Sequence, residues 1–120
     1  MAGEITILQR LAVRKGNLNF SYDTGSLSFD MTGQGGPTPG YFTVGTSEES
    51  IAFSELGTLG HLLMVNLDTT NYVRWGFATG VYGGRLEAGE VAQFRLNPGS
   101  TIYLIANTAA CKCLIYGFED

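Results

Sequence analysis

Charged side chains are scarce in this chain of 120 residues. Its 7 Lys and Arg and 11 Asp and Glu make up 15% of the residues, against about 25% in an average globular protein. The formal net charge is −4 and the pI is near 4.8, which is the wrong sign for gripping a phosphate backbone. The composition therefore excludes nucleic acid as the expected primary ligand.

Long hydrophobic runs are also missing. No apolar stretch approaches the ~20 residues that span a bilayer, and the opening residues place Glu4 where a secretory signal carries cations. We expect no membrane partner and synthesis in a cytoplasm. Hydrophobic residues still make up 44% of the chain, enough for the core of one domain of this size.

Histidine and cysteine, the usual metal ligands and nucleophile partners, are nearly absent. His61 is the only histidine, at the head of an apolar strand, so a hydrolytic triad is not expected and the ring is predicted to bond a backbone carbonyl. Cys111 and Cys113 lack two further ligands for a closed zinc site. The sequence predicts two free buried thiols, no metal and no cofactor.

Carboxylates do not suggest catalysis either. The candidates for a glycosidase-like pair are Glu48, Glu49, Glu55, Glu87 and Glu90, and all lie in turn-like sequence where charges are normally solvated. Asp23 and Asp68 stand in turn sequences that could be taken for calcium loops, but Asx-turns explain both. We expect no catalytic residues and a protein that is not an enzyme.

Glycine, by contrast, is abundant, with 17 of 120 positions, and apolar residues recur with period two or in short runs rather than with helical spacing. The pattern predicts an all-β, single-domain antiparallel β-sandwich, jelly-roll-like, of about 8–10 short strands; a closed barrel has the same pattern. The expected strands are 5–13, 17–22, 26–32, 41–44, 50–53, 62–67, 72–78, 91–96, 101–106 and 112–118.

The first two strictly alternating segments, 17–22 and 26–32, are predicted to form a hairpin turning at Asp23-Thr24-Gly25. One face of this hairpin would carry Leu18, Phe20, Tyr22, Leu27, Phe29 and Met31. The first 32 residues are expected to pair with later strands, because they cannot cover both of their own faces. On that ground residues 1–120 form a single domain.

Residues 33–40 contain four glycines and two prolines. That composition excludes a helix or a central strand. The segment is expected to be an adaptable loop, mobile or ordered by a partner.

Aromatic residues are the remaining resource for binding. Tyr72, Trp75, Tyr82 and Tyr103 are candidates for a sugar-binding platform, but Tyr72 and Trp75 have opposite strand parity, so Trp75 is predicted to be a core residue. A second set, Arg74, Arg85 and Arg95, lies among aromatics and is expected to stack or to form salt bridges at a subunit contact.

Several turn motifs in the second half carry a resemblance. They are Asn66-Leu67-Asp68 with Thr70-Asn71-Tyr72-Val73, then Leu86-Glu87-Ala88-Gly89-Glu90, then Phe94-Arg95-Leu96-Asn97-Pro98-Gly99, then Ala106-Asn107-Thr108-Ala109. In these motifs the chain resembles small β-sandwich structural proteins of tailed-bacteriophage virions. The resemblance implies an architecture and a virion role, and no functional residues.

The function expected on this ground is that of a non-enzymatic virion structural protein. It would be a capsid decoration or cement protein that forms a homo-oligomer and contacts capsid subunits. A tail or neck component is the alternative within this class, and a carbohydrate-binding module is the alternative from another class. The expected location is the virion, after synthesis in the host cytoplasm.

Overall fold

The computed structural model describes residues 3–120, and these fold entirely as strands, turns and loops. The chain divides into two compact units. The hairpin unit is described over residues 3–32, and the sandwich unit comprises Gly33–Asp120. Among the described residues no helix is long and apolar enough to cross a membrane.

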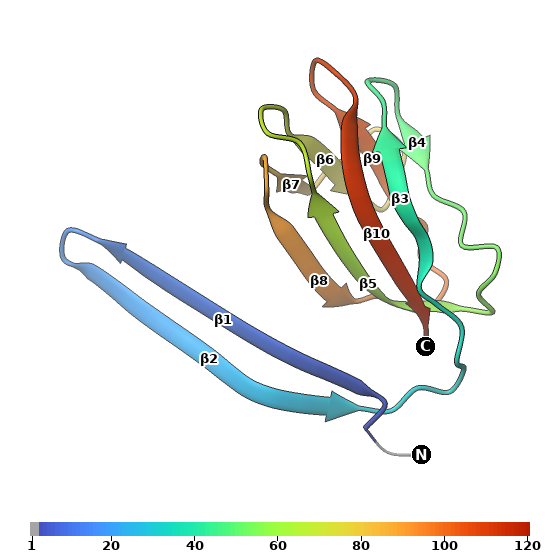
Figure 1. Cartoon of the computed structure of the whole chain (residues 1–120), viewed down its shortest axis with the longest axis horizontal. Coiled ribbons are helices and arrows are strands. Elements are labelled where there is room, and N and C mark those ends of the chain that lie inside the picture. Colours follow the sequence, from blue (N-terminus) through green and yellow to red (C-terminus); the bar gives the residue numbers. More distant parts are fainter. Residues whose placement is uncertain (1–2) are drawn as a thin grey trace. The chain divides into compact units, whose positions relative to one another are not determined.

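The hairpin unit consists of two long antiparallel strands, β1 (Ile5–Lys15) and β2 (Leu18–Phe29) (Figure 1). They are joined by the two-residue turn Gly16-Asn17, in which Gly16 takes the positive φ of 56° that the first position of a tight hairpin turn requires. Among the strands of residues 3–120, β1 and β2 pair only with each other. The expectation that this part of the chain pairs with later strands was therefore wrong.

The predicted turn at Asp23-Thr24-Gly25 is a β-bulge inside β2. The register changes between Leu8, which pairs with Ser26, and Arg10, which pairs with Asp23, so two residues of β2 lie opposite one residue of β1. Gly25 has φ of 65°, as the glycine of a bulge often does. Turn-forming residues here bend a continuous strand, and the predicted strands 17–22 and 26–32 are one strand.

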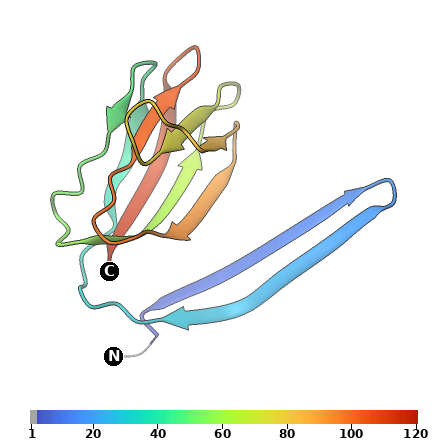
Figure 2. The same cartoon turned by 180° about the vertical axis from the view of Figure 1, so that it is seen from behind.

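The sandwich unit has two antiparallel four-stranded sheets, as predicted. One has the order β3 (Thr38–Val44), β10 (Cys111–Glu119), β5 (Leu59–Asn66), β8 (Val91–Arg95). The other has the order β4 (Glu49–Ser50), β9 (Tyr103–Ala106), β6 (Val73–Gly76), β7 (Gly84–Leu86). Figures 1 and 2 show the two layers from opposite sides. Counted along the chain, the eight strands have the order in which a jelly roll arranges them.

The core lies between these two sheets and is formed by alternate residues of their strands. The fully buried side chains include Leu62, Met64, Leu104 and Ile115. Strand β7 was not anticipated, because three residues beginning with glycine give too short a pattern. Strand β4, expected over 50–53, is only two residues long, and Ile51 after it is buried while its N donates to Ile102 O at 3.2 Å.

The predicted loop 33–40 is bonded into the sandwich unit. Gly33 N donates to Asp120 O at 3.1 Å, and Glu119 N donates to Gly35 O at 3.1 Å. β3 begins at Thr38 and pairs with Gly117 of β10. The idea of an unanchored loop was wrong, because backbone groups provide the anchors that the side chains lack.

Candidate functional site

The hairpin unit exposes one largely apolar face, on which the polar residues are Gln9, between Ile7 and Leu11, and Lys15, the partner of Leu18. Cross-strand partners project from the same face of a sheet, and the register pairs Ile5 with Phe29, Ile7 with Leu27, Leu11 with Tyr22 and Val13 with Phe20. These eight side chains and Leu18 form what we call the hairpin face. The opposite face carries mostly polar side chains, such as Arg10, Ser21 and Ser28, with Leu8 and Ala12 as the exceptions.

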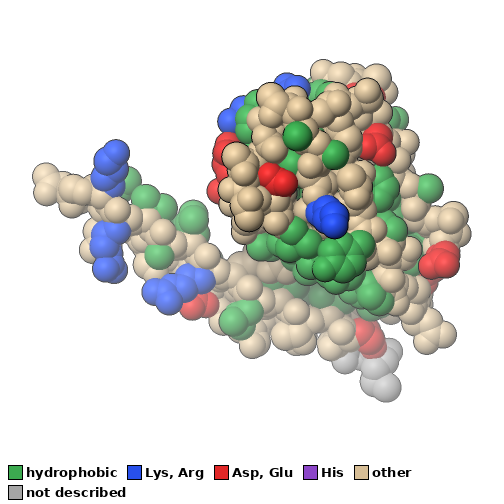
Figure 3. All heavy atoms as spheres, turned by 45° about the horizontal axis from the view of Figure 1, so that its top comes forward, with side chains coloured by type: hydrophobic (Ala, Val, Ile, Leu, Met, Phe, Trp, Pro, Cys, Tyr) green, Lys and Arg blue, Asp and Glu red, His purple; other side chains and the backbone are tan. Residues whose placement is uncertain are grey.

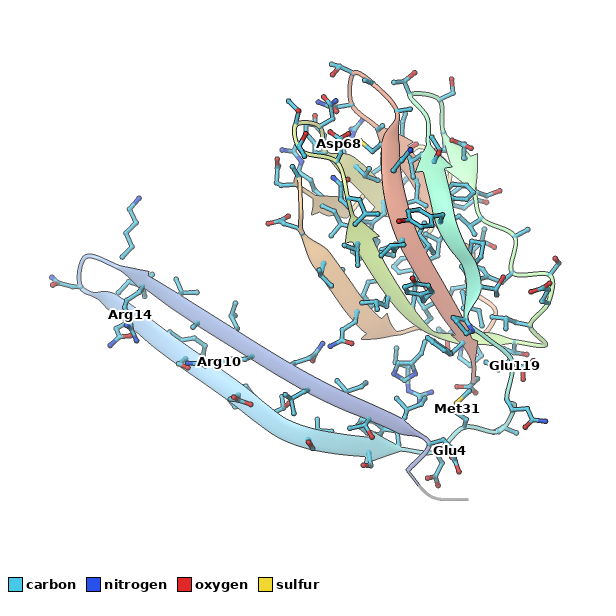
Figure 4. The ribbon with its side chains drawn as sticks, viewed as in Figure 1. Glu4, Arg10, Arg14, Met31, Asp68 and Glu119 are labelled. Carbon is cyan, nitrogen blue, oxygen red and sulfur yellow. The ribbon has the colours of Figure 1, made fainter. Side chains whose placement is uncertain are left out.

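Large side chains of the hairpin face are exposed to solvent. Leu11 is 60% exposed, Phe20 50% and Tyr22 63%. Figure 3 shows hydrophobic side chains along the hairpin with Lys and Arg side chains near its tip, and Figure 4 places Arg10 and Arg14 there. So many large apolar groups gathered on one exposed surface are typical of an interaction site.

A second apolar surface lies on the outside of the sandwich unit. In the sheet β3-β10-β5-β8 the residues that alternate with the core point outward, and the register places Tyr41, Leu114, Val65 and Val91 in one row across the four strands. Leu63 and Tyr116 pair in the next row. We call these six the sheet face. Its two edge residues are the most open, Tyr41 at 74% and Val91 at 58% exposed.

His61 continues this surface between Phe118 and Arg95, its cross-strand partners. The ring is 8% exposed, and its Nδ1 is buried without a hydrogen-bond partner, so the predicted bond from the ring to a carbonyl is not formed through that atom. Burial, with the nearby positive charge of Arg95, lowers the pKa of His61. The ring is therefore uncharged at neutral pH and adds no charge to the apolar surface of this sheet.

The outside of the other sheet is polar. Arg85 stacks over the ring of Tyr72 at 3.9 Å and Arg74 over that of Tyr82 at 5.0 Å. Arg95, which lies in β8 of the first sheet, pairs with Asp120 at 2.6 Å. These arginines stack and form salt bridges within one chain, and the predicted subunit contact stays a prediction. A base or sugar ring cannot use the tyrosine faces that the guanidinium groups cover.

The other two nominated platform residues behave differently. Trp75 packs against the core, with its ring stacked on Phe94 at 5.0 Å between centroids, as predicted for a core residue. Tyr103 is half-buried and pairs with Gly76 in the sheet. The four aromatics therefore do not form one flat platform.

The candidate carboxylates form local bonds. Glu48 accepts hydrogen bonds from the Tyr82 hydroxyl and from Gly80 N, which lower its pKa. Glu49 accepts from Gly45 N at 2.7 Å, and Glu90 from Glu87 N at 2.7 Å.

Glu87 itself pairs with Arg85 at 3.0 Å, and Glu55 is exposed. Among residues 3–120 no three His, Cys, Asp or Glu side chains group in a way that could hold a metal ion.

Both nominated Asx-turns are present. Asp68 Oδ2 accepts from Asn71 N at 2.6 Å and from Thr70 N at 3.0 Å, which lowers its pKa. Asp23 Oδ1 accepts from Gly25 N at 2.8 Å. Figure 4 labels Asp68 at the turn that follows β5. The carboxylates thus stabilise turns by bonding backbone amides.

The two cysteines are free and buried, as predicted. Burial, with smaller contributions from Cys111 and Asp68, raises the pKa of Cys113 to about 12. A thiol with so high a pKa is a poor nucleophile at neutral pH.

The two surfaces best suited to binding a partner are thus the hairpin face and the sheet face. Sequence reasoning placed the β2 residues of the hairpin face on one side from their alternation, but it expected that side to be buried, and the structure leaves it exposed. For the sheet face, the nearly continuous apolar runs in strands 62–67 and 112–118 left two alternatives open, central strands covered on both faces or strands with one face against another subunit. Comparison of the chain with protein-family models, with curated proteins and with solved structures found no match.

Proposed function

We propose that this protein is a non-enzymatic structural component of a tailed-phage virion, a capsid decoration or cement protein that acts through homo-oligomerisation and contacts with capsid subunits. The observation that carries the proposal is the hairpin face. A two-stranded hairpin is marginally stable on its own in water, and this one presents nine apolar side chains outside the core of the sandwich unit. Such an element suits a protein that works inside an assembly.

The sandwich unit supports the same proposal. Jelly rolls occur in viral capsid proteins, as well as in lectins, and the turn motifs that resemble virion proteins form ordered turns here. Asn66 Oδ1, for instance, accepts from Asp68 N at 3.0 Å. Because one fold serves many functions, the fold adds to the argument from the hairpin face and does not replace it.

Immuno-electron microscopy of phage particles from the source of the sequence tests the proposal. Antibody raised against the chain is expected to label the capsid surface. Label confined to the tail or neck would favour the alternative component, and particles without any label would contradict a virion role. A glycan array probed with the same protein tests the carbohydrate-binding alternative, and specific binding there would overturn the proposal.

A further inference from the structure

The hairpin face and the sheet face are both apolar surfaces of a β-sheet and are suited to packing against each other. Each is an apolar β-surface without a layer over it from its own unit, and two β-sheets pack face to face at ~10 Å with their apolar sides interdigitating. Each chain carries one of each surface. We propose that the hairpin face of one copy docks on the sheet face of a second copy of the same chain, an inference that rests on the homo-oligomerisation in the proposed function.

The dimensions of the two surfaces fit this contact. The 11 residues of β1 extend ~36 Å at ~3.3 Å per residue, and four strands spaced ~4.8 Å apart are wide enough to accept a two-stranded ribbon. The overlap is limited by the sheet, whose strand β5 has 8 residues and extends ~26 Å, so its flat area is roughly 250 Å² per partner. Two reciprocal contacts in a dimer bury roughly 1,000 Å² in all, about the smallest area expected of a biological interface.

Charge complementarity also favours a second copy of this chain. The distal half of the hairpin carries Arg10, Arg14 and Lys15 against the single acid Asp23. The sandwich unit carries eight acidic and four basic residues. The cationic tip of one copy is therefore attracted to the sandwich unit of another, whereas two tips repel each other.

Matched variants test this docking by light scattering over a range of concentrations. Phe20→Asp disables the hairpin face and Tyr41→Asp with Val91→Asp disables the sheet face, while Ser21→Asp and Val81→Asp are controls on the polar hairpin face and on a loop. Placing a carboxylate inside an apolar contact is expected to weaken self-association by at least about 30-fold. The two controls should keep the mass of the unmodified protein.

Mixing the two disabled variants gives the sharpest result. One retains an intact sheet face and the other an intact hairpin face, so an equimolar mixture should form a species of twice the 12.9 kDa chain mass while each variant alone remains monomeric. Circular dichroism melts confirm that the sandwich unit is folded in every variant.

Three results would overturn the inference. They are an unmodified chain that is monomeric at all concentrations, a sheet-face variant that assembles like the unmodified chain, and a mixture that forms no pair. Labelling of virions by antibody is independent of these results. A labelled virion with a monomeric chain would refute the docking alone, and an unlabelled virion with a docked oligomer would refute the virion role alone.

Discussion

Tyr22 and Leu27, five residues apart in one strand, project from the same face of the hairpin. Tyr22 pairs with Leu11 and Leu27 with Ile7, and these two partners are four residues apart in the regular strand β1. An odd separation in an uninterrupted strand would place the two side chains on opposite faces. The extra residue of the bulge at Thr24 and Gly25 corrects the parity and makes the hairpin face continuous.

Deleting Thr24 is expected to break that continuity. Without the extra residue, either Leu27 and Phe29 turn to the polar face or the pairing with β1 slips by one residue. We expect loss of self-association as measured by light scattering, with an unchanged melting temperature of the sandwich unit. Gly25→Asn is the control, because asparagine tolerates the positive φ and should retain the bulge.

Asn66 joins the turn that follows β5 to the turn that follows β7. Its side chain is completely buried, its Nδ2 donates to Asn71 O at 3.0 Å and to Leu86 O at 3.1 Å, and its Oδ1 accepts from Asp68 N. Asn66→Ala leaves these groups without partners and should lower the free energy of unfolding by about 2–4 kcal/mol. Urea denaturation measures the change, and Asn97→Ala, at an exposed turn, should have little effect.

Glu119 links the start of the sandwich unit to its end. Its carboxylate accepts from Gly57 N at 2.6 Å and from Gly35 N at 3.1 Å, and these bonds lower its pKa below the ordinary value of 4.5. Figure 4 labels it at the end of β10. A lowered folded-state pKa contributes stability that is present above the unfolded-state pKa and is lost as pH falls through the folded-state value.

Glu119→Gln should therefore lower the melting temperature at pH 7 and make progressively less difference as the pH falls below 4.5 through the lowered folded-state pKa. Glu55→Gln removes the same charge from an exposed side chain and is the control. Equal melting curves for Glu119→Gln and the unmodified protein at pH 7 would show that the carboxylate bonds do not stabilise the sandwich unit.

Gly36 is required where the chain passes the end of β10. Its φ is 124°, and a Cβ there would lie 2.6 Å from Gly117 O. Gly36→Ala should lower the free energy of unfolding by about 1–3 kcal/mol, whereas Gly83→Ala, with open space around it, should have little effect. Chemical denaturation compares the two variants, and equal stability would show that the segment 33–37 does not need its backbone contacts.

What the sequence determined by itself was the secondary structure class and much of the layering. Period-two alternation and short apolar runs between turn residues allow strands and exclude helices, because side chains alternate across a sheet. Buried cysteines, the Asx-turns at Asp23 and Asp68 and the core position of Trp75 follow from local chemistry. Such features depend on residues close together in the chain.

The tertiary structure decided everything that depends on distant partners. Asp23-Thr24-Gly25 became a bulge because β1 runs past it to a turn at Gly16, and residues 33–37 are ordered because the amides and carbonyls of Glu119 and Asp120 meet them. The sheet face exists only once β3, β10, β5 and β8 are neighbours. Pairing between strands far apart in sequence sets which apolar residues form the core and which remain open to a partner, and local patterns do not encode that pairing.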